Sequence, residues 1–105
     1  MHVNPDILSN VIEAALAEVA GNKRWENAIT KGAQLIEEER CLPTENGSLL
    51  IFSDSGNEYN ATENDCRSGD KPCRAFEKGF PCKHRAAFRL MALLEEAEAA
   101  SATSH

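Results

Sequence analysis

The sequence predicts a small α+β domain, in which two N-terminal helices precede a small antiparallel β-hairpin or sheet and a C-terminal helix. Apolar residues recur at helical spacing near the start of the chain and again after position 84. Strand-forming residues flanked by turn signals lie between these two regions. The 105 residues, of which 42% are hydrophobic and 6% aromatic, are typical of one globular domain with a small core.

The N-terminal helical region is predicted to cover residues 1–45 and to contain two helices. In the first, residues 4–20, Asn4 can cap the helix, Pro5 suits its first position and Gly21 ends it. Its apolar face comprises Ile7, Leu8, Val11, Ile12, Leu16 and Val19. The second helix is expected from about Lys23 to Glu39, before a break at residues 41–43. Its apolar stripe comprises Trp25, Ile29, Gly32 or Ala33, and Ile36, flanked by Ala28 and Leu35.

Residues 46–98 are predicted to form a second module, and residues 99–105 a flexible tail. After a turn at residues 46–47, strands are expected at residues 49–53 and 58–62, joined by a turn cluster at 54–57, in a sheet of two or at most three strands. Residues 63–81 are rich in Gly, Pro, Asp and Lys and are expected to be irregular. A helix then begins at His84 and frays after about Glu98. Its buried face is predicted to consist of Ala87, Leu90, Met91 and Leu94.

Charge is unevenly distributed along the chain, whose net charge is −6. Residues 1–64 carry a net charge of −7, residues 65–94 carry +4 and residues 95–105 carry −3. The total argues against a protein that coats nucleic acid, but it hides a cationic segment. We find no signal-like or membrane-spanning segment in the sequence, so we expect a cytoplasmic protein with no membrane partner, or a nuclear or nucleoid-associated one if it binds DNA.

The strongest candidate site is a cluster of metal-ligand residue types in the cationic segment. Cys66, Cys73, Cys82 and His84 follow the spacing Cys-x6-Cys-x8-Cys-x-His. Three cysteines and one histidine are a common ligand set for one structural Zn²⁺, and metal binding can order a loop that buries little apolar surface. Zinc therefore outweighs two disulfides, buried free thiols and a redox site, which usually has a Cys-x-x-Cys motif.

The remaining cysteine and histidines are not expected to belong to this cluster. Cys41 lies 25 residues before Cys66 and is interpreted as a half-buried free cysteine. An all-cysteine site that uses Cys41 instead of His84 remains an alternative, but it needs a longer loop closure. His2 and His105 are expected to be exposed at the termini.

The C-terminal half, over residues 47–94, resembles a SWIM-type zinc finger. The order of residues 53–56, Tyr59, Ala61, Cys66, residues 73–76 (Cys-Arg-Ala-Phe) and residues 81–84 (Pro-Cys-Lys-His) is similar to that family's. The resemblance implies that Cys66, Cys73, Cys82 and His84 bind zinc, with a β-hairpin for the first cysteines and a helix for the histidine. The chain departs from the family pattern in having six residues, rather than one, between its first two cysteines.

The resemblance implies a non-catalytic module that binds proteins or DNA. No phosphate-binding glycine loop, H-E-x-x-H motif or nucleophile–base pair is evident, so we do not expect an enzyme or any catalytic residue. The favoured function is a small protein-interaction or adaptor module, which can also form a homodimer through its N-terminal helices. The alternative is a nucleic-acid-binding finger, for DNA or RNA, in which the phosphate-contacting residues are Arg67, Lys71, Arg74, Lys78, Lys83, Arg85 and Arg89.

Overall fold

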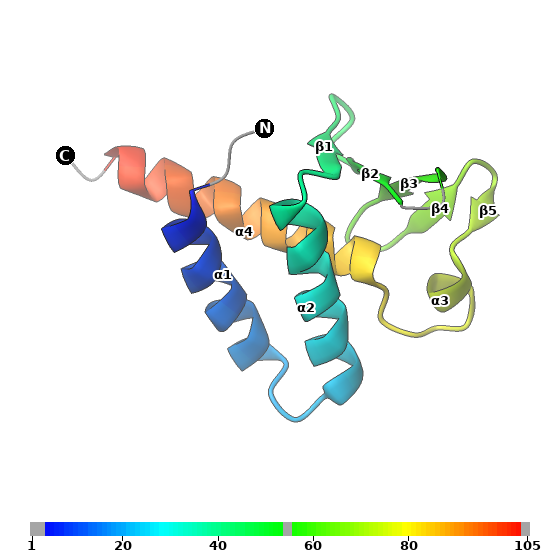
Figure 1. Ribbon diagram of the computed structural model, residues 1–105, viewed down its shortest axis with the longest axis horizontal. Coiled ribbons are helices and arrows are strands. Elements are labelled where there is room, and N and C mark those ends of the chain that lie inside the picture. Colours follow the sequence, from blue (N-terminus) through cyan, green and yellow to red (C-terminus); the bar gives the residue numbers. More distant parts are fainter. Residues whose placement is uncertain (1–3, 54–55, 104–105) are drawn as a thin grey trace.

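The computed structural model describes residues 4–53 and 56–103 and confirms the α+β class (Figure 1). These residues form four helices and a five-stranded antiparallel sheet. The helices are α1 (Pro5–Glu18), α2 (Lys23–Glu37), α3 (Arg74–Glu77) and α4 (Lys83–Thr103). The strands are β1 (Cys41–Pro43), β2 (Leu49–Phe52), β3 (Glu58–Ala61), β4 (Cys66–Ser68) and β5 (Lys71–Pro72). None of the helices within these two stretches is long and apolar enough to cross a membrane.

The two N-terminal helices form where the sequence predicts them. The Asn4 side chain accepts hydrogen bonds from the backbone N–H groups of Asp6 and Ile7, and Pro5 begins α1. In α2 the Asn22 side chain caps the helix through the Trp25 N–H. The predicted apolar stripe is buried at its centre, and the buried residues of α2 are Ala28, Ile29, Gly32, Ala33, Leu35 and Ile36.

The sheet has more strands than the two or three that the sequence predicts. Its order is β1-β2-β3-β4-β5, so each strand pairs with the next along the chain. Residues 41–43, predicted only to break a helix, form β1, with Cys41 opposite Ile51. Pro43 is tolerated there because β1 is an edge strand, where a missing N–H costs no ladder bond. The turn predicted at residues 54–57 includes Asp54 and Ser55, which lie outside the described residues.

The segment predicted to be irregular, residues 63–81, contains three short elements. Strands β4 and β5 form a hairpin in which Arg67 lies opposite Pro72 and Ser68 opposite Lys71, and Gly69 adopts a φ of 63° in its turn. The single turn of α3 follows. In α4, Ala87, Leu90, Met91 and Leu94 are buried as predicted. Its helical conformation continues to Thr103, and the fraying expected after about Glu98 stays a prediction.

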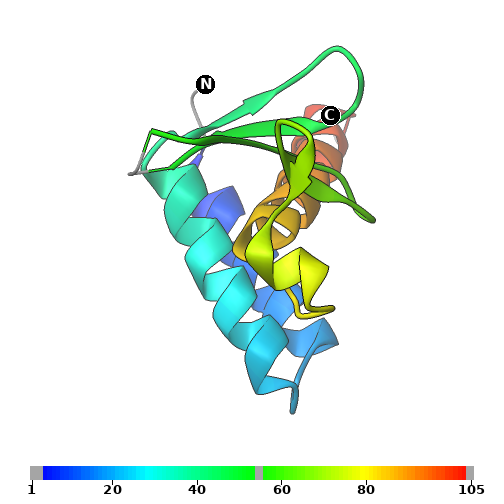
Figure 2. The same cartoon turned by 90° about the vertical axis from the view of Figure 1, so that its right-hand side faces the viewer.

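The core lies between the helices and the inner face of the sheet, which crosses one side of the helical layer (Figure 2). Helix α2 crosses α4 closely because Gly32 has no side chain. A Cβ atom on Gly32 would lie 2.8 Å from the backbone nitrogen of Ala87 and 2.9 Å from the carbonyl oxygen of Lys83. This close contact places the first turn of α4 against α2 and beside the sheet, where the candidate site lies.

Candidate metal centre

The structure brings Cys66, Cys73, Cys82 and His84 together in one buried cluster. Their ligand atoms all lie within 4.8 Å of one another. Cys66 is on β4, Cys73 caps α3, and Cys82 and His84 flank the first residue of α4. The cluster therefore lies where the sheet, the short helix and the long helix meet, and it links chain segments that share few other contacts.

The β4–β5 hairpin explains the long spacer between the first two cysteines. The six intervening residues fold back on themselves, and the Cys73 N–H donates a 2.9 Å hydrogen bond to the Cys66 carbonyl oxygen. The two cysteines therefore lie opposite each other at the open end of the hairpin. A spacer of six residues can therefore bring two ligands as close together as a much shorter spacer would, because the extra residues form the hairpin.

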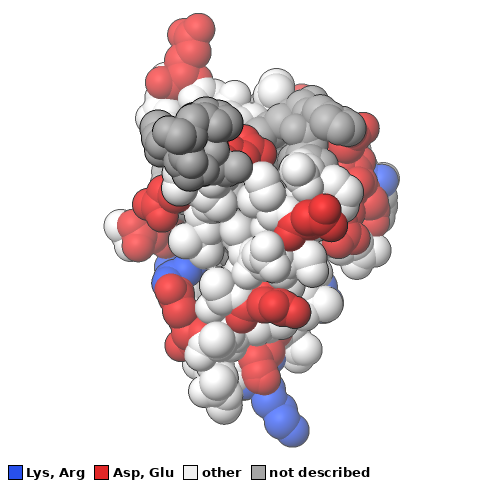
Figure 3. Space-filling view, turned by 90° about the vertical axis from the view of Figure 1, so that its left-hand side faces the viewer, with Lys and Arg blue, Asp and Glu red and all other residues white. Residues whose placement is uncertain are grey.

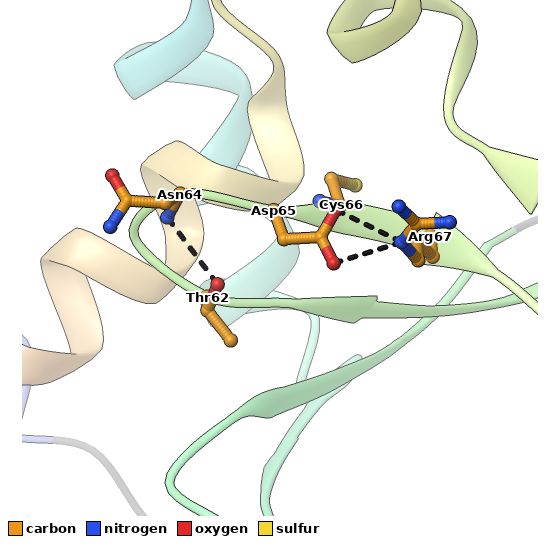
Figure 4. A network of polar contacts seen from close by, with 5 residues as sticks. All are labelled: Thr62, Asn64, Asp65, Cys66 and Arg67. Atoms are coloured by element: carbon orange, nitrogen blue, oxygen red, sulfur yellow. Dashed lines mark hydrogen bonds and ion pairs between the residues drawn. The ribbon is translucent and has the colours of Figure 1, made fainter.

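The turn before β4 fixes the position of Cys66 (Figure 4). The Asp65 carboxylate accepts hydrogen bonds from the Cys66 N–H at 3.0 Å and from the Arg67 guanidinium at 2.9 and 3.2 Å. The Thr62 N–H donates to the Asp65 carbonyl oxygen at 2.8 Å, and the Asn64 N–H donates to the Thr62 hydroxyl oxygen at 3.3 Å. These contacts close the turn around the residue that precedes the first cysteine.

The start of α4 supplies the other two candidate ligands. Cys82 stands just before the helix, and its sulfur accepts a 3.3 Å hydrogen bond from the Arg85 N–H. Cys73 accepts a similar bond, at 3.5 Å, from the Phe76 N–H of α3. The Arg85 side chain reaches the Glu63 carbonyl oxygen at 3.0 and 3.1 Å and so ties α4 to the turn before Cys66. Backbone N–H groups at helix starts favour anionic sulfur, the form that binds metals.

The geometry and chemistry of the cluster fit a tetrahedral metal ion. With metal–sulfur distances of about 2.3 Å and metal–nitrogen distances of about 2.0 Å, tetrahedral ligand atoms lie roughly 3.5–3.8 Å apart. The Cys66 sulfur and His84 Nδ1 are 3.4 Å apart. All four residues are buried, and the four cysteines of the chain are free rather than disulfide-bonded. The residues present can therefore hold one metal ion.

The His84 ring is held in place by stacking. It lies nearly parallel to the Tyr59 ring, at 16° with the centroids 4.1 Å apart. Nδ1 faces the Cys66 sulfur, whereas Nε2 is buried and has no hydrogen-bond partner within the described parts of the chain. Metal binding at Nδ1 would leave the ring proton on Nε2.

The thiols of the cluster influence one another strongly. Hydrogen bonding from the Cys66 thiol is the main cause that lowers the pKa of Cys82 to about 4, against an opposing effect of burial; His84, the Arg85 N–H and Cys73 contribute further lowering. The same contact with Cys82, together with burial, raises the pKa of Cys66. Before any metal binds, the cluster therefore already favours a thiolate at Cys82.

Cys41 lies apart from this cluster and packs in the core on β1. It is buried rather than half-buried, because its side chain lies on the inner face of the sheet. Burial raises the pKa of its thiol to about 11, so Cys41 stays neutral where a metal ligand would be a thiolate. His2 and His105 lie outside the described residues.

Three of the seven basic residues predicted to contact phosphate are engaged within the protein. Arg67 pairs with Asp65, Arg89 pairs with Glu18 of α1, and Arg85 binds the Glu63 carbonyl oxygen. Lys71 and Lys78 are exposed. The last two, Arg74 and Lys83, line a cleft with a volume of about 470 Å³ beside the cluster.

Two residues of this cleft were missed by the sequence analysis. Arg24 and Lys31, on α2, line its opposite wall. Both residues belong to the segment of residues 1–64, whose net negative charge hides them. The missed signal is local: the two residues are seven positions apart, which places them on the same face of a helix two turns apart.

No family model, curated protein or solved structure that was compared with this chain matches it. The structure itself therefore supports two statements: the fold is a small α+β domain, and a buried Cys3His group in it can hold one metal ion.

Proposed function

We propose that the chain is a SWIM-like module whose Cys3His cluster holds one structural Zn²⁺. The observation that supports this proposal is that four buried ligand atoms lie within 4.8 Å of one another, where the sheet meets α3 and α4. Thiolates and imidazole are the ligands that tetrahedral Zn²⁺ prefers in structural sites. The hairpin that carries Cys66 and the helix that carries His84 also agree with the arrangement that the family resemblance implies.

The proposed metal centre is structural rather than catalytic. Four protein ligands complete a tetrahedral Zn²⁺ and leave no position for a reacting water. The surroundings also keep solvent away from the ligands, because the Cys66 side chain is fully buried and the Tyr59 ring covers the His84 ring. The ion would therefore stabilise the fold by linking β4, α3 and α4.

Metal analysis of matched variants tests this centre. Purified wild type should contain one zinc per chain, and Cys82→Ser or His84→Ala should lose it because each removes one of the four donors. Cys41→Ser, which also removes a buried thiol, should retain one zinc per chain. Equal zinc loss in Cys41→Ser and Cys66→Ser would contradict the ligand assignment.

For the biological role we propose a protein-interaction adaptor. The observation that favours it is an outer apolar strip, formed by Leu42, Leu50 and Phe52 on the sheet face opposite the helices. Leu42 lies opposite Leu50 in the β1–β2 ladder, and Phe52 points to the same side. Leu42 is 50% exposed and Phe52 38%. Adjacent exposed apolar side chains of this kind suit a partner protein that presents apolar residues.

A binding comparison tests the adaptor role once cross-linking in cells has identified candidate partners. The affinity of a purified partner should fall at least about tenfold for the variant Leu42→Ser/Phe52→Ser, because apolar contacts at the centre of an interface dominate its affinity. Asn60→Ser, on the polar part of the same face, is the control and should bind like wild type. If both variants bind as tightly as wild type, the strip is not the interface.

Nucleic-acid binding is the second candidate function, and the cationic cleft favours it. Arg74 and Lys83 line that cleft, whereas Arg67, Arg85 and Arg89 are held by intramolecular contacts. Mobility shifts on single- and double-stranded oligonucleotides should weaken as salt rises, if phosphate contacts carry the binding. The absence of any shift at about 50 mM salt would reject this function.

A further inference from the structure

We propose that the cleft between α2 and the metal-binding loop binds a ligand that combines a phosphate group with a planar ring, such as a nucleotide unit. This inference goes beyond the adaptor role and deepens the second candidate function, because it names the ligand class of the cationic cleft. It rests on the proposed metal centre only because the centre would hold the loop of residues 73–84 in place. The cleft has a volume of about 470 Å³, within the range of pockets that bind small molecules.

The charge of the cleft wall points to an anion. Arg24 and Lys31 of α2, Arg74 of α3 and Lys83 of α4 line the cleft, and no Asp or Glu among the described residues does. The candidate ligands Cys73 and Cys82 line it too, but a zinc ion bound by three thiolates and one imidazole carries a net charge of only −1, which four cations outweigh. None of these four side chains has an ion pair with another described residue. Glu38 lines a neighbouring pocket together with Lys31 and Lys83, but its pKa is lowered mainly by its hydrogen bond with Arg40 and only weakly by the charge of Lys83. Four cations that converge on one space match a multiply charged group better than a single carboxylate.

The remaining lining favours a ligand with a ring rather than bare phosphate. Tyr59, Ala75, Phe80 and Pro81 contribute apolar surface beside the cations. The Arg24 guanidinium stacks over the Phe80 ring at 4.0 Å, and Phe80 is 41% exposed. Stacking restrains the guanidinium at the cleft wall while its N–H groups remain available to a phosphate oxygen. A nucleotide unit would use both kinds of surface, whereas inorganic phosphate would use only the cations.

His84 connects the cleft with the metal cluster. It lines the cleft, its Nδ1 faces the Cys66 sulfur, and its buried Nε2 has no partner among the described residues. Metal binding at Nδ1 would hold the ring that forms part of the cleft wall. The cations and the apolar surface of the cleft carry the proposal.

Calorimetric titration of the metal-loaded protein tests the proposal. The probes are inorganic phosphate, adenosine monophosphate, a short single-stranded oligonucleotide with a 5′ phosphate, and the same oligonucleotide without it. Adenosine monophosphate should bind more tightly than inorganic phosphate, and its affinity should fall as salt rises from about 50 to 200 mM. Equal affinity for the nucleotide and the phosphorylated strand would indicate a free nucleotide as the source, and tighter binding of the strand would indicate a strand terminus.

Paired variants locate the binding. Arg24→Gln/Lys31→Gln removes two cleft cations and should weaken nucleotide binding at least about tenfold, because charge-assisted bonds to phosphate are lost. Lys23→Gln/Lys78→Gln makes the same change in net charge at exposed residues that do not line the cleft. It should bind within about twofold of wild type, because salt screens charges outside the site. Both variants should retain their zinc, since neither alters a ligand of the cluster.

Three results would overturn the proposal. They are no detectable binding of any phosphate probe at low salt, an equal loss of affinity in the two paired variants, and tighter binding of a glutamate-rich peptide than of adenosine monophosphate. The last result would identify the cleft as a site for an acidic protein segment. Zinc content, measured on the same samples, reports separately on the metal centre, so failure of one proposal is distinguishable from failure of the other.

Discussion

At the scale of single residues, the four cysteines divide into two chemical classes according to their surroundings. Cys66, Cys73 and Cys82 face one another and His84, and the pKa of Cys82 is lowered to about 4 mainly by hydrogen bonding from Cys66. Cys41 faces apolar side chains, and burial raises its pKa to about 11. The same side chain thus favours the thiolate at Cys82 and the neutral thiol at Cys41.

The buried thiol of Cys41 predicts a loss of stability at alkaline pH. Because the pKa in the folded protein lies above the usual value of 9.0, the neutral thiol contributes fully to stability below pH 9. That contribution is lost as the pH rises toward 11, by on the order of 1–3 kcal/mol. Denaturant unfolding of the metal-loaded protein at pH 8 and at about pH 10.5 should show a smaller decrease in Cys41→Ala than in wild type. Equal decreases would contradict the assignment.

The Asp65 carboxylate is predicted to act as a positioning group for the metal centre. Asp65→Ala removes the acceptor for the Cys66 N–H and should lower metal affinity about tenfold, as the loss of such supporting contacts typically does. Competition with a chromophoric chelator measures this affinity. Asp65→Asn keeps one acceptor oxygen and should retain most of the affinity.

The control for this prediction is Arg67→Gln. It breaks only the exposed ion pair with Asp65 and should leave metal affinity near that of wild type, because exposed pairs contribute little. If Arg67→Gln weakens metal binding as much as Asp65→Ala does, the ion pair rather than the hydrogen bond to Cys66 positions the ligand.

At the scale of secondary-structure elements, two contacts place the candidate metal centre. The β4–β5 hairpin brings Cys66 beside Cys73, and the close crossing of α2 and α4 at Gly32 places the start of α4 beside the sheet. Arg24 and Lys31 of α2 line one cleft with Arg74 of α3 and Lys83 of α4. The crossing therefore contributes to the position of both the cluster and the cationic cleft.

Replacement of Gly32 by alanine should destabilise the protein. The added Cβ would meet backbone atoms of Ala87 and Lys83 at 2.8 and 2.9 Å, so the two helices must separate. We expect a net loss of about 1–3 kcal/mol, even though alanine favours a helix over glycine by roughly 1 kcal/mol. Chemical denaturation measures the change. Thr30→Ala, on the exposed side of the same helix, should change stability by less than about 1 kcal/mol.

An increase in stability for Gly32→Ala would mean that helix propensity outweighs the steric conflict. The crossing would then be looser than the structure indicates. The variant also separates the two proposed sites. A wider crossing should lower the affinity of the cleft for nucleotide by a larger factor than it lowers the zinc content per chain, because no zinc ligand lies on α2.

At the scale of the whole molecule, surface charge is divided between two ends, whereas the hydrophobic core is continuous. The end formed by α1 and the C-terminal part of α4 presents mainly acidic side chains (Figure 3), whereas the cleft at the other end of α4 is lined by four cations. The hydrophobic core, in contrast, is shared, since one cluster of buried residues includes Cys66, Cys73 and Cys82 together with residues of α1, α2 and α4. Acidic and basic side chains thus gather at opposite ends of one packed unit, and the basic end takes two of its four cations from residues 1–64, whose net charge is negative.

Because the core is shared, metal removal should destabilise the helices as well as the loop. A strong chelator should lower the midpoint of thermal unfolding by at least about 10 °C, because structural metal binding contributes directly to folding free energy. The fluorescence of Trp25, on α2, should change at the same temperature as circular dichroism. A helical signal whose midpoint is unaffected by the chelator would show that the helices fold independently of the metal centre.

The sequence by itself determined the local structure and the chemistry of this protein. Helical periodicity and the Asn4 cap predicted the helices, and the spacing of Cys66, Cys73, Cys82 and His84 indicated which residues could share a metal ion. These features are local, since they depend on residues within a few turns of one another or on side-chain type alone.

Only the tertiary structure decided how distant segments combine. The long spacer after Cys66 forms a hairpin, Cys41 enters the core instead of the cluster, and two cations of α2 line one cleft with one of α3 and one of α4. Each outcome depends on contacts between residues far apart in the chain, such as Gly32 with Lys83 and Ala87. Short edge strands such as β1 and β5 are missed for the same reason, because they are stabilised by pairing and not by their own composition.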